Sequence, residues 1–366
     1  MPQTLQLDDL PDLARGAALL GTGGGGDPYI GVLLVSAELE RGRTITLIDP
    51  EEVDDEALVI ASAFMGAPTV VIEKIPSGDE AVVALRRLEQ HLGRSADAII
   101  PMECGGLNSM VPLLVAARTG LPIVDGDGMG RAFPELQMET FGVYGVSGSP
   151  IAICNERNHV TLIDTGTDNH SMEWYARGVT IRMGGVSYIA EDPMTGTQVK
   201  QTAIPRTMTL ALRLGRVIRE AHEQHRDPFR ALVDCLADTI YRHGRTLLEG
   251  KVVDVERSSA DGFVRGTAHI STFDGSRRVV LTFQNEHLMA YDGDRLLAVV
   301  PDLISVLDAE SAAPITTEAL RYGQRVRIFA ISTPQIMRTP EALAVFGPRA
   351  FGLDIDWIPV EELAAG

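Results

Sequence analysis

The sequence predicts two domains: an N-terminal α/β domain with a mainly parallel sheet, and a β-rich C-terminal domain. Strand-like and helix-like runs alternate up to about residue 130, and this pattern of predicted elements changes near residue 165. After residue 249, short β-rich runs with Asp-Gly or Gly turns predominate. A length of 366 residues also favours two or three domains over one. The predicted domains are residues 1–165 and residues 166–366, the second beginning with a helical connection.

The N-terminal elements follow one another in the order that a parallel sheet requires. Apolar residues at helical spacing predict a helix over residues 10–20, which runs into a glycine-rich loop. Ligands of parallel sheets collect beyond the carboxyl ends of strands, and two polar, glycine-rich segments follow predicted strands here. The other predicted elements are a helix over 29–41, strands over 44–48 and 57–63, a helix over 79–92, a strand over 96–101, a helix over 110–118 and a strand over 122–124.

The second half begins with helices and continues with strands. Residues 205–225 have the pattern of a long helix, and residues 227–243 that of another. Short runs rich in β-branched residues, bounded by turn residues, then predict strands. These runs are residues 251–256, 262–270, 278–284, 296–300 and 325–331.

The chain is acidic, with 50 Asp and Glu against 32 Lys and Arg and a formal net charge of −18. Such a field repels nucleic-acid phosphates and anionic membranes, and no run of basic residues overrides it. No apolar stretch reaches the ~18–20 residues that cross a bilayer, and the N-terminus lacks a secretory pattern. Three scattered cysteines agree with a reducing compartment. We therefore expect a cytoplasmic homodimer that binds a small molecule and neither nucleic acid nor membrane.

The glycine-rich loop is the first candidate ligand site. Backbone N–H groups around Gly23, Gly24 and Gly25 can converge on a ligand, and Asp27 adds a carboxylate. The loop lacks the lysine of a phosphate-binding loop and follows a helix instead of a strand, so a phosphate is not required as its ligand. A turn that lets two elements pack closely explains the glycines equally well.

Two strand-end loops carry four polar residues that belong together. Asp125 and Asp127 follow the strand over 122–124, and two carboxylates at this spacing can bind a hard cation or shift each other's pKa. Glu103 and Asn108 follow the preceding strand, so a parallel sheet places them beside the two aspartates. A structural Asp-Gly turn is the alternative interpretation of the aspartates.

Three further side chains complete the candidate set. His170 lies among carboxylates, and mixed imidazole and carboxylate ligands suit Zn, Mn or Fe, although no HExxH or CxxC motif is present. Arg131 can bind a substrate carboxylate bidentately or serve as a structural ion-pair partner. Cys104 can act as a nucleophile if its pKa is lowered, or can be a small buried residue.

Segments along the whole chain resemble the S-methyl thiohydantoin desulfurase-like family, whose neighbours include hydantoinase and oxoprolinase proteins. The resemblance implies an N-terminal α/β domain and a C-terminal β-rich domain. The segments that carry it are LLGTGGGGDPY at 19–29, PMECGGLNSMVPL at 101–113, GLPIVDGDGMGRAFPELQM at 120–138, FQNEHLMA at 283–290, VVPDLISVLD at 299–308, LRYGQRV at 320–326 and FGPRAFGLD at 346–354.

The resemblance also implies a substrate class, namely five-membered thiohydantoin or hydantoin rings. The expected reaction is the hydrolytic desulfurisation of 3-(5-oxo-2-thioxoimidazolidin-4-yl)propionic acid, a step of ergothioneine breakdown, or of a similar ring, with release of hydrogen sulfide. Two alternatives stay open. One is a hydantoin- or oxoproline-type ring hydrolase, and the other is a noncatalytic ligand-binding subunit of a hydantoinase-like complex.

Such a hydrolysis needs an activated water and a proton donor for the departing hydrosulfide. We expect Glu103 to be the general base, and we expect the remaining acidic residues to hold a divalent metal, Zn or Mn, or to orient the water. The predicted metal ligands are Asp125, Asp127 and His170, of which the two aspartates are also predicted to be catalytic. The predicted substrate-binding residues are Gly23, Gly24, Gly25, Asp27, Asn108 and Arg131, the last for a substrate carboxylate.

Overall fold

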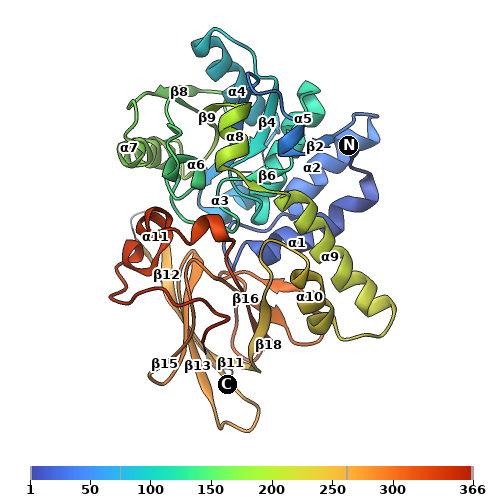
Figure 1. Cartoon of the computed structure of the whole chain (residues 1–366), viewed down its shortest axis with the longest axis vertical. Coiled ribbons are helices and arrows are strands. Elements are labelled where there is room, and N and C mark those ends of the chain that lie inside the picture. The colour runs from blue at the N-terminus through green and yellow to red at the C-terminus, as the bar shows by residue number, and fades with distance from the viewer. Residues whose placement is uncertain (1, 75, 261–262, 364–366) are drawn as a thin grey trace.

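The computed structural model describes residues 2–74, 76–260 and 263–363. Over these ranges the chain forms two large sheets of eight strands each, and most helices gather round the first sheet (Figure 1). The N-terminal sheet and its helices form one end of the molecule, and the antiparallel C-terminal sheet forms the other. The predicted pairing of an α/β domain with a β-rich domain is therefore confirmed.

The first sheet has a parallel centre and antiparallel edges. In spatial order its strands are β1 (Gln3–Thr4), β2 (Thr46–Ile48), β5 (Ile123–Val124), β4 (Ala98–Pro101), β3 (Leu58–Gly66), β9 (Val186–Thr195), β7 (Ile151–Cys154) and β8 (Val160–Ile163). The central strands β2, β5, β4 and β3 are parallel neighbours, as the predicted order of elements requires. The other pairings are antiparallel, and β9 joins this sheet from beyond residue 165.

Helices cover the first sheet and extend beside the second. The predicted helices over 10–20, 29–41, 79–92 and 110–118 are confirmed with ends that differ by at most one residue. None of the helices in the described ranges is both long enough and apolar enough to cross a membrane. The helices are α1 (Leu10–Leu20), α2 (Tyr29–Glu40), α3 (Pro68–Glu73), α4 (Asp79–Leu92), α5 (Val111–Thr119), α6 (Thr140–Val143), α7 (Asn169–Arg182), α8 (Gly196–Thr202), α9 (Thr207–Glu223), α10 (Pro228–Ala237) and α11 (Pro340–Phe346).

One helix prediction is too long. The pattern over residues 227–243 predicts a continuous helix, but α10 ends at Ala237. The chain then turns so that Tyr241 becomes buried and its hydroxyl donates to the Gly130 carbonyl oxygen. A tertiary contact to the first domain therefore ends the helix earlier than the local pattern predicts.

The second sheet is antiparallel throughout. Its strands, in spatial order, are β15 (Arg295–Val299), β14 (Glu286–Asp292), β13 (Arg278–Gln284), β12 (Phe263–Ser271), β11 (Gly244–Ala260), β18 (Arg325–Ile331), β16 (Leu303–Asp308) and β17 (Pro314–Ile315). The five predicted β-rich runs fall within or largely within β11, β12, β13, β15 and β18, so these predictions are confirmed. A short ladder of β6 (Gly126–Asp127) with β10 (Ile204–Pro205) lies apart from both sheets.

α1 packs on α9 at a distance that side chains would prevent. A Cβ atom on Gly16 would lie 1.7 Å from the Ala211 carbonyl oxygen, and one on Gly215 would lie 1.8 Å from the Asp12 carbonyl oxygen. The two backbones therefore touch, and α1 also contacts β16 and β17 of the second sheet. This helix pair helps to hold the two domains in one arrangement, with the end of α1 leading directly into the glycine-rich loop (Figure 1).

The N-terminus of α9 is capped by a residue from another element. Arg206, which precedes α9, has a left-handed backbone with φ 63° and gives no side-chain cap. Asp125, just after β5, supplies the acceptor: its Oδ1 accepts from the Thr209 N–H at 3.0 Å, and its Oδ2 accepts from the Thr209 hydroxyl. Asp125 therefore satisfies groups that a helix start leaves without partners, and its charge suits that end of the helix.

Replacing Asp125 tests this capping role. Asp125→Ala removes both contacts to Thr209, so we expect the free energy of unfolding to fall by about 1–2 kcal/mol, measured by urea denaturation. The matched control is Asp294→Ala in the exposed turn between β14 and β15, which should change stability by less than about 0.5 kcal/mol. Equal losses in the two variants would contradict the role.

Candidate functional site

The glycine-rich loop lies between the two domains. On one side, the Thr22 carbonyl oxygen accepts from the His287 backbone N–H of β14 at 2.9 Å. On the other side, the Gly25 carbonyl oxygen accepts from the Leu107 N–H, in the loop after β4, at 2.8 Å. The loop therefore lies between the second domain and the strand ends of the first domain, and it is hydrogen-bonded to both.

The predicted ligand-binding residues of this loop have different surroundings. Gly24 and Gly25 line a cavity at the domain boundary. The Gly23 carbonyl oxygen accepts from the Thr317 N–H at 2.7 Å, so that group already serves the domain contact. Asp27 is exposed, and its carboxylate accepts from the first N–H of α2 at 2.9 Å. The close-packing interpretation of the glycines therefore accounts for most of the loop.

Glu286 reaches this cavity from the second domain. It is the first residue of β14, is 3% exposed, and passes so close to the loop that a Cβ atom on Gly24 would lie 2.0 Å from its Oε1. The Gly25 N–H donates to its carboxyl group, while Oε2 is buried without a hydrogen-bond partner among the described residues. Burial raises the pKa of Glu286 to about 8, against the opposing effect of the nearby Arg131 charge.

Glu103 reaches the same cavity from the first domain. Its Oε1 accepts from the Asn108 side-chain amide at 2.7 Å, and the Asn108 Oδ1 in turn accepts from the Phe64 N–H at 2.7 Å. The amide is therefore fixed by the end of β3, and it orients the carboxyl group. Oε2 of Glu103 is buried and has no hydrogen-bond partner in the described part of the chain. Burial raises the pKa of Glu103 well above its usual range, and the Glu286 charge adds to this.

The cavity that both carboxyl groups line has a volume of about 50 Å³. Phe64, Met65, Met102 and Phe133 supply apolar walls. A volume of this size holds only a few water molecules. Both domains contribute its polar lining, which consists of Glu103, Asn108, Glu135, Arg177, Asn285, Glu286 and Glu318. We call this space the inner cavity.

A wider hollow, the outer groove, adjoins the inner cavity along Glu135 and Arg177, which line both. It has a volume of about 890 Å³ and is formed mainly by α7. Trp174 is 71% exposed and Tyr175 51% exposed on this face, and Phe263 of the second domain completes the wall.

The carboxylates of the two predicted catalytic aspartates accept hydrogen bonds from backbone N–H groups. Neither residue lines the inner cavity or the outer groove. Asp127 is fully buried, and its two oxygens accept from the Cys104 N–H at 2.6 Å and the Gly130 N–H at 2.9 Å. Burial raises its pKa to about 7. Asp127 therefore ties the loop that carries Glu103 to the loop that follows β6, and Asp125 caps α9.

The predicted metal ligands do not come together. His170 is exposed on α7 and lines the outer groove, whereas Asp125 and Asp127 are buried against backbone N–H groups. Among the residues that the structure describes, no group of three His, Cys, Asp or Glu side chains is spaced to hold a metal ion. These residues therefore do not fit the predicted Zn or Mn centre, and the use of a metal stays a prediction.

Arg131 serves the domain interface. It is fully buried, and its Nη2 donates to the Thr22 hydroxyl at 2.8 Å and to the His287 carbonyl oxygen at 3.0 Å. Its Nη1 donates to the Asp302 carbonyl oxygen at 2.9 Å. The guanidinium is thus used by protein acceptors from both domains and does not line the inner cavity, which favours the structural alternative over contact with a substrate carboxylate.

Cys104 fits the description of a small buried residue. Its side chain is 1% exposed, and Sγ lies 3.4 Å from the Thr207 carbonyl oxygen and 3.3 Å from the Met208 sulfur. Burial raises the pKa of the thiol well above its ordinary value, which opposes formation of a nucleophilic thiolate. Its position next to Glu103 places its backbone, and not its sulfur, at the site.

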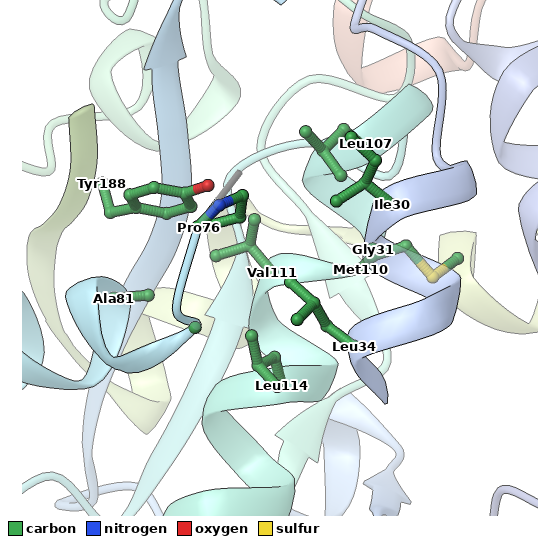
Figure 2. Close-up of a pocket in the computed structure, with 11 residues that line it drawn as sticks. Ile30, Gly31, Leu34, Pro76, Ala81, Leu107, Met110, Val111, Leu114 and Tyr188 are labelled. Atoms are coloured by element: carbon green, nitrogen blue, oxygen red, sulfur yellow. The ribbon is translucent and has the colours of Figure 1, made fainter. Parts of the chain in front are cut away.

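A separate apolar cavity of about 20 Å³ lies between α2 and α5 (Figure 2). Side chains such as Leu34, Met110 and Leu114 line it, and the Tyr188 ring, at the left of this view, lines it too. Burial raises the pKa of the Tyr188 hydroxyl, so this group is not poised for proton transfer near neutral pH. The cavity therefore fits a packing defect of the first domain better than a reaction site.

The sequence-based interpretation missed Glu286, Glu318 and Arg177 as members of the site. Glu286 lies in the FQNEHLMA segment, which was recognised as part of a family pattern but given no role. The signal that could have found it is an acidic residue directly after an Asn at the end of a predicted strand.

Gly24 gives a direct test of the contact between the loop and Glu286. We expect Gly24→Ala to lower the free energy of unfolding by about 1–3 kcal/mol, because the new methyl group must displace the Glu286 carboxyl. Gly178→Ala is the matched control, since no atom lies within 4 Å of its added Cβ and alanine suits a helix. A Gly24→Ala protein as stable as the parent would show that the loop has room to move.

Comparisons with known proteins agree with the two-domain fold. The protein resembles, with a TM-score of 0.81 and 26% sequence identity, the X-ray crystal structure of a protein from Chromobacterium violaceum determined by a structural genomics consortium; the match covers 98% of this chain and 100% of that one. The comparison with curated proteins gives no match. Residues 8–165 match the S-Me-THD-like N-terminal domain and residues 167–360 the S-Me-THD-like C-terminal domain. The chain therefore belongs to the S-Me-THD-like family, the family of S-methyl thiohydantoin desulfurase-like proteins.

Proposed function

We propose that this protein is a hydrolase that removes sulfur from a thiohydantoin ring as hydrogen sulfide. The observation that carries the proposal is the pair Glu103 and Glu286: two buried carboxyl groups from different domains line one cavity, and each has one oxygen without a hydrogen-bond partner among the described residues. Family membership supports the class of ring. Hydrolysis of a C=S group needs a proton acceptor for water and a proton donor for sulfur, and two such carboxyl groups supply both.

The surroundings of the two groups favour different roles. At Glu286 the Arg131 charge opposes the rise in pKa that burial causes, whereas at Glu103 the hydrogen bond from the Asn108 amide opposes it most. We therefore propose Glu286 as general base and Glu103 as general acid, which reverses the role that the sequence suggests for Glu103. The hydrogen bond from Asn108 occupies Oε1 of Glu103, which leaves Oε2 to carry the proton.

The proposed reaction balances with water alone. Glu286 accepts a proton as the water oxygen bonds to the C=S carbon, which gives a tetrahedral intermediate with charge on sulfur. Glu103 donates its proton to the sulfur as the C–S bond breaks, and the ring carbonyl forms. The hydrosulfide takes up the proton of the added hydroxyl group as the carbonyl forms and leaves as hydrogen sulfide, and the proton on Glu286 passes through solvent to Glu103, which returns the pair to its starting state. The buried, low-dielectric cavity strengthens each of these interactions.

The first compound to assay is the propionate-substituted thiohydantoin that the family resemblance implies. We expect Glu103→Gln and Glu286→Gln each to lower kcat for sulfide release by about 10²–10⁴-fold, because glutamine can neither donate nor accept the proton. Glu341→Gln, on an exposed position of α11, is the control and should retain activity. Sulfide is measured colorimetrically, and the hydantoin product by mass spectrometry.

The outcomes separate the rival functions. Release of sulfide that is unchanged in both glutamine variants would remove the carboxyl pair from the mechanism. Opening of a hydantoin ring without sulfide release would favour a ring hydrolase instead. Binding of either ring without any product would favour a noncatalytic ligand-binding subunit.

The pH profile tests the assignment of the base. A base must be ionised to act, and the Glu286 pKa is raised to about 8, so kcat/KM should increase as the pH rises through about 8. The same group is protonated and inactive as a base below that pH. The rising limb should disappear in Glu286→Gln and persist in the Glu341→Gln control. A limb that persists in Glu286→Gln would assign it to another group.

A further inference from the structure

A second group of buried carboxyl groups lies in the first domain, apart from the inner cavity. Glu139 directly precedes α6, and Glu191 and Asp192 are consecutive residues of β9. All three side chains are fully buried, and none of them lines the inner cavity or the outer groove. Both carboxyl oxygens of each residue lack a hydrogen-bond partner among the described residues. We call these three residues the carboxyl cluster.

A bulge in β9 allows two consecutive carboxyl groups to act on the same neighbour. Adjacent residues of a regular strand point to opposite faces of the sheet. Here the register of β9 against β3 shifts between Glu191 and Met194, and Asp192 has a left-handed backbone with φ 51°. Glu191 and Asp192 are both close enough to Glu139 for their charges to raise its pKa. The bulge therefore helps to assemble the cluster.

The carboxyl groups of Glu139 and Asp192 are within hydrogen-bond reach of each other. An ionised carboxylate has acceptors only, so two ionised groups at this contact repel and cannot form a hydrogen bond. When one of the two is protonated, its O–H donates to the other, and a hydrogen bond to a charged acceptor is a strong one. A proton thus converts the contact from repulsive to attractive.

The cluster has no compensating positive charge in the part of the chain that the structure describes. The charged side chains that act on it are its own members and Glu173 of α7, which adds to the repulsion at Glu191. The partner of Glu173 is Arg177, so that guanidinium is already matched. The neighbouring segments β3, α6, β7 and residues 144–150 contain no Asp, Glu, Lys or Arg.

The nearest basic residue of α8 is also engaged elsewhere. α6 contacts α8, and the Lys200 ammonium of α8 donates to the Asp55 carboxylate at 2.6 Å. The carboxyl groups must therefore be neutralised by something other than the basic side chains around them, because several uncompensated charges at full burial cost more than a folded domain tolerates.

Burial favours protons as the neutralising species. It raises the pKa of Glu139 and of Glu191 well above the usual range, and it raises that of Asp192 to about 7. The same groups in an unfolded chain have pKa values near ~4. The folded state therefore binds more protons than the unfolded state above this pH. Stability from the cluster is greatest below pH ~4 and falls as the pH rises through the raised values.

We propose that Glu139 and Asp192 share one proton in the folded protein and that Glu191 is kept protonated beside them, so that the carboxyl cluster is a pH-sensitive device within the first domain. Loss of these protons at alkaline pH leaves repelling charges between α6 and β9 and favours their separation. The segment that leads to Glu139 includes Leu136, which lines the inner cavity, so the device adjoins the candidate site. The inference does not depend on the proposed desulfurase function.

The pH dependence of unfolding tests the shared proton. The number of protons taken up on folding is the slope of the logarithm of the unfolding constant against pH, measured by urea denaturation between pH ~7.5 and ~9. Asp192→Asn suits a left-handed backbone, cannot ionise, and can donate from its amide to Glu139. We expect the slope to fall by about one in Asp192→Asn, in Glu139→Gln and in the double variant alike, because one proton is shared. Glu191→Gln should lower it by about one independently.

Glu80→Gln is the matched control. Glu80 is also buried, at 1% exposed, but its carboxylate accepts from the backbone N–H groups of Ser77 at 2.9 Å and Gly78 at 2.8 Å. We expect the slope to stay unchanged in this variant. If Asp192→Asn does not fold, Glu139→Gln and Glu191→Gln provide the same comparison.

Three results would overturn the proposal. A slope that changes in none of the cluster variants would show that the cluster holds no proton. A loss of about two in the double variant would show that Glu139 and Asp192 hold separate protons. The third result concerns cations: the protein is dialysed against a chelator, and K⁺, Mg²⁺, Ca²⁺ or Mn²⁺ chloride is added at pH ~8. Stabilisation by one of these salts that is lost in Asp192→Asn and kept in Glu80→Gln would assign a cation to the cluster in place of the proton.

Discussion

The hydrogen bonds that hold the glycine-rich loop between the domains are the constraint on which the candidate site depends. Thr22 and Gly25 bond to opposite sides, one to β14 and the other to the loop after β4. Any side chain on Gly24 would meet the Glu286 side chain, so glycine at this position lets that carboxyl group approach the loop backbone. The close approach places a carboxyl group of the second domain at the strand ends of the first, where α/β proteins bind their ligands.

One buried cation sets the electrostatics of this interface. Arg131 is fully buried, and oxygen acceptors from both domains satisfy its donors, so the charge is retained without water. Its field opposes the rise in the pKa of Glu286 that burial causes, whereas at Glu103 the hydrogen bond from the Asn108 amide opposes that rise most. Arg131 and the Asn108 amide therefore give the two carboxyl groups different surroundings. Two groups with equal surroundings would share a proton without a preferred donor and acceptor.

The sequence predicts the helices and parallel strands of the first domain well, but only some of the residues of the candidate site. Local periodicity locates α1, α2, α4, α5 and the parallel strands, because these depend on neighbours in the chain. The strand-end rule identifies Glu103 and Asn108 as a pair, yet it also selects Asp125 and Asp127, which turn to backbone N–H groups of α9 and the adjacent loops. Which way a strand-end carboxylate turns depends on its tertiary partners. Glu286 is more than 150 residues away in the chain, and only the docking of the domains shows that it belongs to the site.

The division of the site between domains has a consequence for how the fold carries function. Neither domain holds both carboxyl groups, and neither encloses the inner cavity alone. The contacts that stabilise the domain interface therefore also fix the relative positions of the two carboxyl groups. These contacts are made by Arg131, by the glycine-rich loop and by the packing of α1 on α9. A change that leaves both domains folded but shifts one against the other by a fraction of an ångström separates the acid from the base, because proton transfer needs both within hydrogen-bond reach of one ring. The interface thus acts as the support that keeps two otherwise ordinary glutamates in position.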